Sequence, residues 1–187
     1  MLNPARQARG FTLLELLIGL SVAAILVTLA VPGMTRLMRE SQAGAAVNDL
    51  VYALRLARNE AVTRKLPVAV CASADAEKCA GDNDWHEGLL VFTDPDEDGD
   101  CQDDGSGDCK GGGTILHRAE GADADLELSA NGNPKGGVVI YDSHGFATGY
   151  QSTFTLCDGS GEVERRGFTL NMSGRVSKDA TSLGKCG

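Results

Sequence analysis

The stretch ARGFTLLELLIGLSVAAILVTLAVPG, residues 8–33, decides the fold, because its apolar run is long enough to cross a membrane. About 20 apolar residues are enough to span the hydrocarbon core of a bilayer. Glu15 is the one acidic residue of this stretch and lies near its front. A carboxylate at the bilayer centre costs roughly 2.5 to 3.5 kcal/mol on insertion scales. We therefore expect Glu15 to have a partner that offsets this cost.

The residues that flank the apolar run predict its orientation. Residues 1–9 contain Arg6 and Arg9 and no acid, so the positive-inside rule places Met1 in the cytoplasm and the chain after Pro32 outside. A secretory signal peptide has a shorter apolar core that is followed by its cleavage site. Here the candidate cleavage site precedes the core, which is an unusual order.

The sequence GFTLLELLI, Gly10 to Ile18, followed by the apolar run and Pro32, resembles the amino-terminal signature of type IV pilins and of the pseudopilins of type II secretion. In that family a prepilin peptidase cuts after the glycine and methylates the new amino terminus. The resemblance implies cleavage after Gly10 and N-methylation of Phe11. A plain signal anchor is the alternative interpretation.

A cut before Phe11 creates an ammonium group one helical turn from Glu15, because residues four apart share a face of a helix. In a helical filament, a neighbouring subunit can set its own amino terminus against Glu15 within an apolar bundle. Leaving a buried charge unpaired is what costs free energy, so this pairing favours assembly. Glu15 is thus the predicted assembly residue, and we expect Pro32 to kink the helix near the membrane exit.

The chain divides into four predicted segments: a leader peptide at 1–10, a transmembrane and filament-core helix at 11–32, an amphipathic second half of the helix at 33–66, and a periplasmic head at 67–187. In the amphipathic segment, apolar residues recur at steps of three and four, which predicts a buried helical stripe. The stripe consists of Val47, Leu50, Leu54, Ala57 and Ala61. The opposite, polar face carries Arg55, Arg58, Glu60 and Arg64.

From Pro67 the pattern changes to short runs rich in β-branched and aromatic residues, separated by Gly, Asn and Asp, which predicts antiparallel strands. The runs lie at 67–73, 88–94, 114–120, 126–130, 137–143, 152–158 and 166–172. Their spacing favours hairpins over βαβ units, so the head should be a helix packed on one or two antiparallel sheets. The predicted fold class is α+β, a type IV pilin-like fold with a long amino-terminal helix.

Composition and cysteines indicate an exported protein. The chain has 187 residues and a formal charge of −9, which disfavours general adhesion to nucleic acid or anionic lipid. Its six cysteines form no C-x-x-C pair and predict disulfides in an oxidising compartment. Equal spacers favour the pairs Cys71 with Cys79 and Cys101 with Cys109, which leaves Cys157 with Cys186. Other pairings and buried thiols stay open.

Three further stretches resemble the minor pilins and pseudopilins of the GspH/FimT group: DWHEGLLVFTDPDEDGD at 84–100, FTLCD at 154–158 and MSGRVSK at 172–178. The resemblance implies a minor subunit that primes or caps a type IV pilus. Its implied partners are major and minor pilins, the prepilin peptidase and an inner-membrane assembly platform. It also implies a single-pass inner-membrane protein that moves into the filament. A type II secretion pseudopilin for protein export is the alternative.

The acidic turn DPDEDGDCQDDG, residues 94–105, begins like the first half of an EF-hand calcium loop. The candidate calcium ligands are Asp94, Asp96, Asp98 and Asp100. The twelfth position is Gly105 instead of the expected glutamate, although Asp103 or Asp104 could substitute. A solvated loop closed by a disulfide is the alternative to a calcium site.

Basic residues gather near the carboxyl terminus of this acidic protein, and four of them are candidates for DNA binding: Arg165, Arg166, Arg175 and Lys178. Some members of the FimT type bind DNA through a Gly-Arg-x-Arg motif at this place. Here Ser177 stands where the second arginine is expected, which weakens that resemblance. The alternative is a hairpin whose cations are solvated or pair with Glu162 and Glu164.

No pattern predicts catalysis. The three histidines, His86, His117 and His144, are isolated, and the glycine-rich KGGGT at 110–114 lacks the ending of a phosphate-binding loop. Trp85 and Phe92 are expected to anchor the core. The sequence therefore predicts a subunit that works by non-covalent assembly and not an enzyme.

Overall fold

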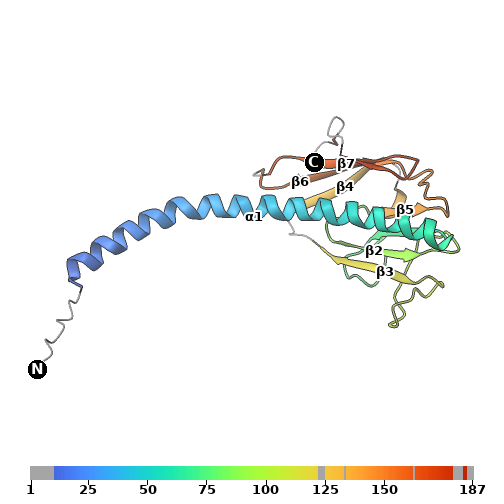
Figure 1. The fold of residues 1–187 in the computed structure, drawn as a ribbon, viewed down its shortest axis with the longest axis horizontal. Helices are drawn as coiled ribbons and strands as arrows, with labels where there is room; N and C mark the ends of the chain where they lie inside the picture. Colours follow the sequence, from blue (N-terminus) through green and yellow to red (C-terminus); the bar gives the residue numbers. More distant parts are fainter. Residues whose placement is uncertain (1–10, 122–124, 133, 162, 179–182, 185–187) are drawn as a thin grey trace, which may run out of the picture. The chain divides into compact units, whose positions relative to one another are not determined.

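A computed structural model describes residues 11–121, 125–132, 134–161, 163–178 and 183–184. Within these residues, helix α1 (Leu13–Arg64) is followed by eight strands and one short 3₁₀ turn, η1 (Lys135–Gly137) (Figure 1). The chain forms two compact units, Met1–Met38 and Arg39–Gly187. The boundary falls inside α1, so the carboxy-terminal part of the helix belongs to the same unit as the strands.

The amino-terminal unit is helical from Leu13 and is apolar on all sides. None of its most apolar 18-residue window is buried within the protein. The helix is long and apolar enough to cross a membrane. A helix that is apolar all round needs an apolar environment on every face, which a bilayer or a bundle of such helices supplies.

The carboxy-terminal unit contains two antiparallel four-stranded sheets. The first has the order β3-β2-β1-β5 and consists of β3 (Ile115–Glu120), β2 (Gly88–Thr93), β1 (Val68–Ala72) and β5 (Val138–Tyr141). The second has the order β4-β6-β7-β8 and consists of β4 (Leu126–Gly132), β6 (Ser152–Asp158), β7 (Arg166–Leu170) and β8 (Val176–Ser177).

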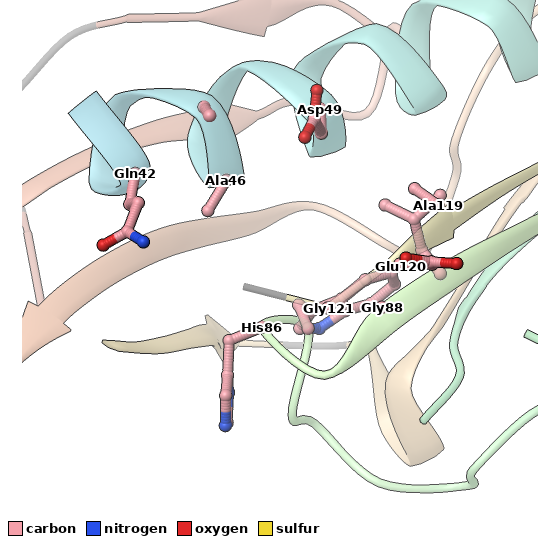
Figure 2. Close-up of a pocket in the computed structure, with 11 residues that line it drawn as sticks. Gln42, Ala46, Asp49, His86, Gly88, Ala119, Glu120 and Gly121 are labelled. Carbon is pink, nitrogen blue, oxygen red and sulfur yellow. The ribbon is translucent and has the colours of Figure 1, made fainter. Parts of the chain in front are cut away.

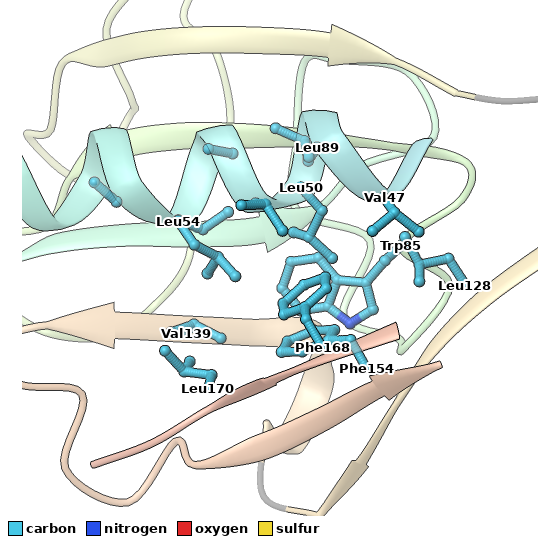
Figure 3. Close-up of a cluster of buried hydrophobic side chains, with 14 of the residues drawn as sticks. Val47, Leu50, Leu54, Trp85, Leu89, Leu128, Val139, Phe154, Phe168 and Leu170 are labelled. Carbon is cyan, nitrogen blue, oxygen red and sulfur yellow. The ribbon is translucent and has the colours of Figure 1, made fainter. Parts of the chain in front are cut away.

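The main core of this unit joins α1 to both sheets. Val47, Leu50 and Leu54 on α1 point toward the aromatic side chains of the strands (Figure 3). Phe154 on β6 stacks on Phe168 of β7 with ring centroids 4.8 Å apart, and Trp85 meets the edge of Phe154 at 5.5 Å. Each fully buried side chain of this size stabilises the fold by roughly 1.5 to 3 kcal/mol. The helix is thus the central packing element of the head.

A second, smaller cluster covers the other face of the first sheet. Strand residues of this face alternate with those that face α1, and Leu90, Phe92 and Ile140 are members. Cys71 of β1 and the loop cysteines Cys79, Cys101 and Cys109 pack against them. Disulfides join Cys71 to Cys79 and Cys101 to Cys109, which confirms both predicted pairings. The loops therefore form a covalently closed cover over strands that would otherwise face solvent.

The predicted elements agree closely with the structure. All five residues of the predicted helical stripe are buried, and each of the seven predicted strands is present. Strand β8 and η1 were not predicted. Arg58 is a correction: it is half-buried instead of lying on the polar face, because its Nε donates a hydrogen bond to the carbonyl of Gly145 at 3.0 Å.

Candidate functional site

The start of α1 is built as a capped helix terminus. The Oγ1 of Thr12 accepts a hydrogen bond from the backbone N–H of Glu15 at 3.2 Å. This is the first half of a capping box, in which threonine and a glutamate three residues later satisfy free backbone donors. The negative charge of Glu15 also lies in the first turn, where the helix dipole favours it. The cap thus fixes Glu15 at the front of the apolar helix.

Glu15 has no ion-pair partner among the described residues. Its side chain is exposed, and no cation among the residues that the structure describes lies within ion-pair distance. Its neighbours are apolar and equally open: Phe11 is 85% exposed and Leu13 is 80% exposed. The predicted cleavage residue Gly10 lies outside the described residues. Pro32 lies within α1, and its predicted role in assembly stays a prediction.

The acidic turn gathers three of its four predicted ligands. Carboxylate oxygens of Asp94, Asp96 and Asp98 lie within 4.8 Å of one another and could hold a metal ion, whereas Asp100 is not in this group. Asp94 is buried, and its Oδ2 accepts a hydrogen bond from the N–H of Gly99 at 3.1 Å. Burial raises the pKa of Asp94 to about 6, and the nearby carboxylates of Asp96 and Asp98 also raise it.

The two proposed substitutes for the missing twelfth ligand are engaged elsewhere. Asp103 forms an ion pair with Arg118 at 2.6 Å, and the N–H of Gly105 donates a hydrogen bond to it at 2.9 Å. That backbone hydrogen bond and the Arg118 guanidinium lower the pKa of Asp103. Asp104 accepts hydrogen bonds from Ser106. The turn therefore does not complete the EF-hand pattern.

Three of the four basic candidates for DNA binding bond other residues of the head, and the fourth, Arg175, lies apart from Arg166. Arg166 forms an ion pair with Glu40 on α1 at 3.1 Å, and Arg165 donates to the carbonyl of Gly184 at 3.0 Å. Lys178 donates to Asn48 at 3.3 Å. Because β7 pairs antiparallel with β8, Arg175 lies about five strand positions beyond Arg166 in the direction of β7. This offset corresponds to roughly 17 Å along the strand.

The remaining predicted residues are structural. Cys157 is disulfide-bonded, and its predicted partner Cys186 lies outside the described residues. Trp85 and Phe92 are buried, as expected of core anchors. His144 is exposed, while His117 packs edge-on against Tyr52 with ring centroids 5.3 Å apart. None of these placements brings together a nucleophile, a base and an oxyanion donor.

A cavity that the sequence did not reveal lies between α1 and the first sheet. Its volume is about 260 Å³, and its lining includes Asp49, Trp85 and Glu120. In Figure 2, Gln42 and Ala46 of α1 lie on one side of the cavity and Gly121 lies on the other. The His86 ring points away from α1. No sequence signal could have found this cavity, because three separated segments form it.

Comparisons with known proteins agree with this architecture. A model of the family described as type II transport protein GspH matches residues 46–174, and a model of the prokaryotic N-terminal methylation motif matches residues 5–31. Among solved structures, the chain is similar to the type IV minor pilin FimU of Pseudomonas aeruginosa, with 19% identity and a TM-score of 0.51. That match covers 76% of this chain and 92% of FimU.

A second crystal form of FimU aligns with 73% of this chain and 91% of that chain, at 19% identity and a TM-score of 0.49. No curated protein sequence matches the chain. The first structural match confirms the predicted α+β, pilin-like fold, with a long apolar helix followed by an antiparallel head. The GspH match extends from the middle of α1 to Gly174 and so spans most of the head.

Proposed function

Because this chain belongs to the GspH family of type II transport proteins, in the group of type IV minor pilins and pseudopilins, we propose that it is a minor subunit of a type IV pilus. In this proposal it is held in the inner membrane by α1, with the head in the periplasm. The prepilin peptidase removes residues 1–10 and methylates Phe11. The subunit then joins other pilins at the inner-membrane assembly platform and primes or caps the filament.

The observation that carries the proposal is Glu15. It lies in the first turn of the apolar, solvent-exposed amino-terminal part of α1 and has no cation partner among the described residues. In a bilayer or an apolar bundle, this unpaired carboxylate costs free energy that a cation from another chain offsets. The ammonium group of a neighbouring subunit's Phe11 is such a cation, so assembly of the filament supplies the pairing.

The test is the incorporation of Glu15→Ala and Glu15→Gln into filaments. Both variants should insert and be processed normally, because the leader and the apolar run are intact, but should be depleted at least fivefold from sheared pili. Ser21→Ala is the matched control, since it alters a polar residue of the same helix that only bonds the carbonyl of Leu17. Incorporation of Glu15→Ala at the native level would contradict the proposal.

A second candidate function is supported by the description of the family model as a type II transport protein. In that case the same subunit joins a secretion pseudopilus. The same helix chemistry serves both machines, so the discriminating experiment is a deletion strain. Loss of pili with normal protein secretion supports the pilus, and the reverse supports the pseudopilus.

A further inference from the structure

A groove on the outside of the head lies where the acidic turn meets β5. Its volume is about 520 Å³, within the range of sites that bind small ligands or single side chains. Val138, Ile140 and Tyr150 form apolar walls, and Glu97, Asp98 and Asp100 supply carboxylates. All six residues belong to the carboxy-terminal unit. The groove thus combines an apolar lining with a concentrated negative charge.

The acidic side of the groove is held in place by its own backbone. Gly99 is buried against β5, where an added Cβ would lie 2.9 Å from a methyl carbon of Val138. The N–H of Gly99 donates to Asp94, and the N–H of Asp100 donates to Asp98 at 2.8 Å. The carboxylates are therefore presented by a turn that is anchored at its centre.

Several acidic residues elsewhere in the head have a cation of this chain beside them. Asp75 lies 3.6 Å from Lys78, Asp103 pairs with Arg118, and Glu40 pairs with Arg166. Across the residues that the structure describes, by contrast, no lysine or arginine pairs with Glu97, Asp98 or Asp100. Among the described residues, these three carboxylates are therefore open to a cation from another chain.

We propose that this groove receives a lysine or arginine side chain of a neighbouring subunit in the filament. The inference rests on the proposed function, which places another subunit beside the head. Lysine and arginine carry an apolar stem and a charged end, which matches walls of Val138 and Ile140 beneath the carboxylates. The half-buried ring of Tyr150 adds attraction for a cation. Charge pairing of this kind fixes the register of neighbouring subunits.

Photocrosslinking of the full-length chain in filament-forming cells tests the proposal. p-Benzoylphenylalanine replaces Tyr150 as the probe, and the same residue in place of Leu17 reports contacts of the amino-terminal helix. We expect a light-dependent adduct between position 150 and another subunit, with a lysine or arginine in the crosslinked peptide. The paired substitution Glu97→Gln and Asp100→Asn should lower the yield of this adduct at least fivefold.

The control is Asp108→Asn with Glu127→Gln, which makes the same charge change at two exposed residues outside the groove and should leave the yield unchanged. Glu97 and Asp100 also lie outside the three-carboxylate cluster, so their effect is separate from that of a bound metal ion. An adduct that is lost on chelation but insensitive to Glu97→Gln and Asp100→Asn would overturn the proposal.

The probe at position 17 distinguishes a failure of the groove proposal from a failure of the proposed function. An adduct at position 17 without one at position 150 overturns the groove and leaves the proposed function intact. Absence of both adducts, with the chain missing from sheared filaments, overturns the proposed function as well.

Discussion

Arg166 on β7 and Glu40 on α1 form an ion pair at 3.1 Å although they are 126 positions apart in the chain. Their side chains are 38% and 37% exposed. Close by, Arg39 lies 3.0 Å from Asp125 and 3.6 Å from Asp158. These contacts tie the helix to the second sheet at the point where α1 enters the carboxy-terminal unit. Cations that resembled a DNA-binding set therefore include one that holds the head together.

The first prediction concerns this ion pair. Arg166→Met and Glu40→Gln should each lower the stability of the head, and a double-mutant cycle should give a coupling of about 0.2 to 1 kcal/mol, because the pair is partly exposed. Arg175→Met is the matched control and should leave the melting temperature unchanged, since its exposed side chain makes no ion pair among the described residues. A coupling of zero would show that the contact contributes nothing.

A substitution at Arg175 separates DNA binding from stability. If the head binds DNA, the interaction should be salt-sensitive and should depend on Arg175, whose exposed side chain makes no ion pair or hydrogen bond among the described residues. A gel shift at low salt with Arg175→Ala measures this. A complex that persists in Arg175→Ala would exclude the Gly-Arg turn as the binding element.

The second prediction concerns the covalently closed cover of the first sheet. Replacing Cys71 and Cys79 together by alanine should destabilise the head by about 2 to 3 kcal/mol, because the unfolded chain gains entropy when a short loop is opened. Chemical unfolding with and without a reducing agent measures the effect. The reduced wild-type protein should lose at least as much stability as the variant, since it also loses the Cys101–Cys109 disulfide.

The fold was accessible from the sequence because each element buries its own apolar pattern. The steps of three and four from Val47 to Ala61 are a helical stripe in both sequence and structure. Strand β8 was missed because it has only two residues, too few for a pattern. The 3₁₀ turn η1 was missed because its geometry depends on a positive φ at Gly136, which composition alone does not specify.

The candidate sites were only partly accessible. Glu15 could be identified because a charge inside an apolar run stands out without any knowledge of the fold. The partner of Arg166 could not be identified from the sequence, because an ion pair between residues 126 positions apart depends on how α1 docks on the second sheet. The groove beside β5 was also missed, since it joins the acidic turn to residues near Tyr150 that the sequence keeps far apart.

The third prediction follows from the pKa of Asp94, which burial raises from 3.8 to about 6. In the unfolded chain this carboxyl should have a pKa of about 3.9. The folded state therefore binds more protons between these values, so the stability from Asp94 is fully present below about pH 4 and is lost as the pH rises through about 6. Asp94→Asn should be more stable than the wild type at pH 7, by about 1 to 3 kcal/mol.

Thermal melts of both proteins from pH 4 to pH 7 measure this difference. The two curves should converge near pH 4, where the wild-type carboxyl is also neutral. Asp108→Asn is the control, because that residue is exposed and its substitution should give a curve parallel to the wild type. Parallel curves for Asp94→Asn would refute the prediction.

The fourth prediction tests the calcium hypothesis for Asp94, Asp96 and Asp98. A bound cation favours the ionised form of Asp94, so millimolar calcium should stabilise the wild-type head at pH 7 and should do so less in Asp96→Asn. Isothermal titration of the head should then show heat that the variant loses. Absence of heat at millimolar calcium would leave the solvated loop as the correct interpretation.

The last prediction concerns Gly174, the glycine that begins the Gly-Arg-Val element (residues 174–176) of the stretch MSGRVSK at 172–178. Its φ is +73°, and an added Cβ would lie 2.2 Å from the carbonyl oxygen of Gly145 and 3.0 Å from the ring of Tyr141. Gly161 has a similar φ of +71° but open space around it. Gly161→Ala should therefore cost only the left-handed backbone conformation, about 1 to 2 kcal/mol, whereas Gly174→Ala should cost clearly more because the backbone must also shift.

Urea unfolding of the two variants isolates the steric contribution, since their backbone penalties are alike. Because Arg58 donates its hydrogen bond to Gly145, a shift at Gly174→Ala should also weaken the contact between α1 and this turn. Equal destabilisation by the two substitutions would mean that the turn relaxes freely. The presence of glycine at position 174 would then not be explained by its close packing against Gly145 and Tyr141.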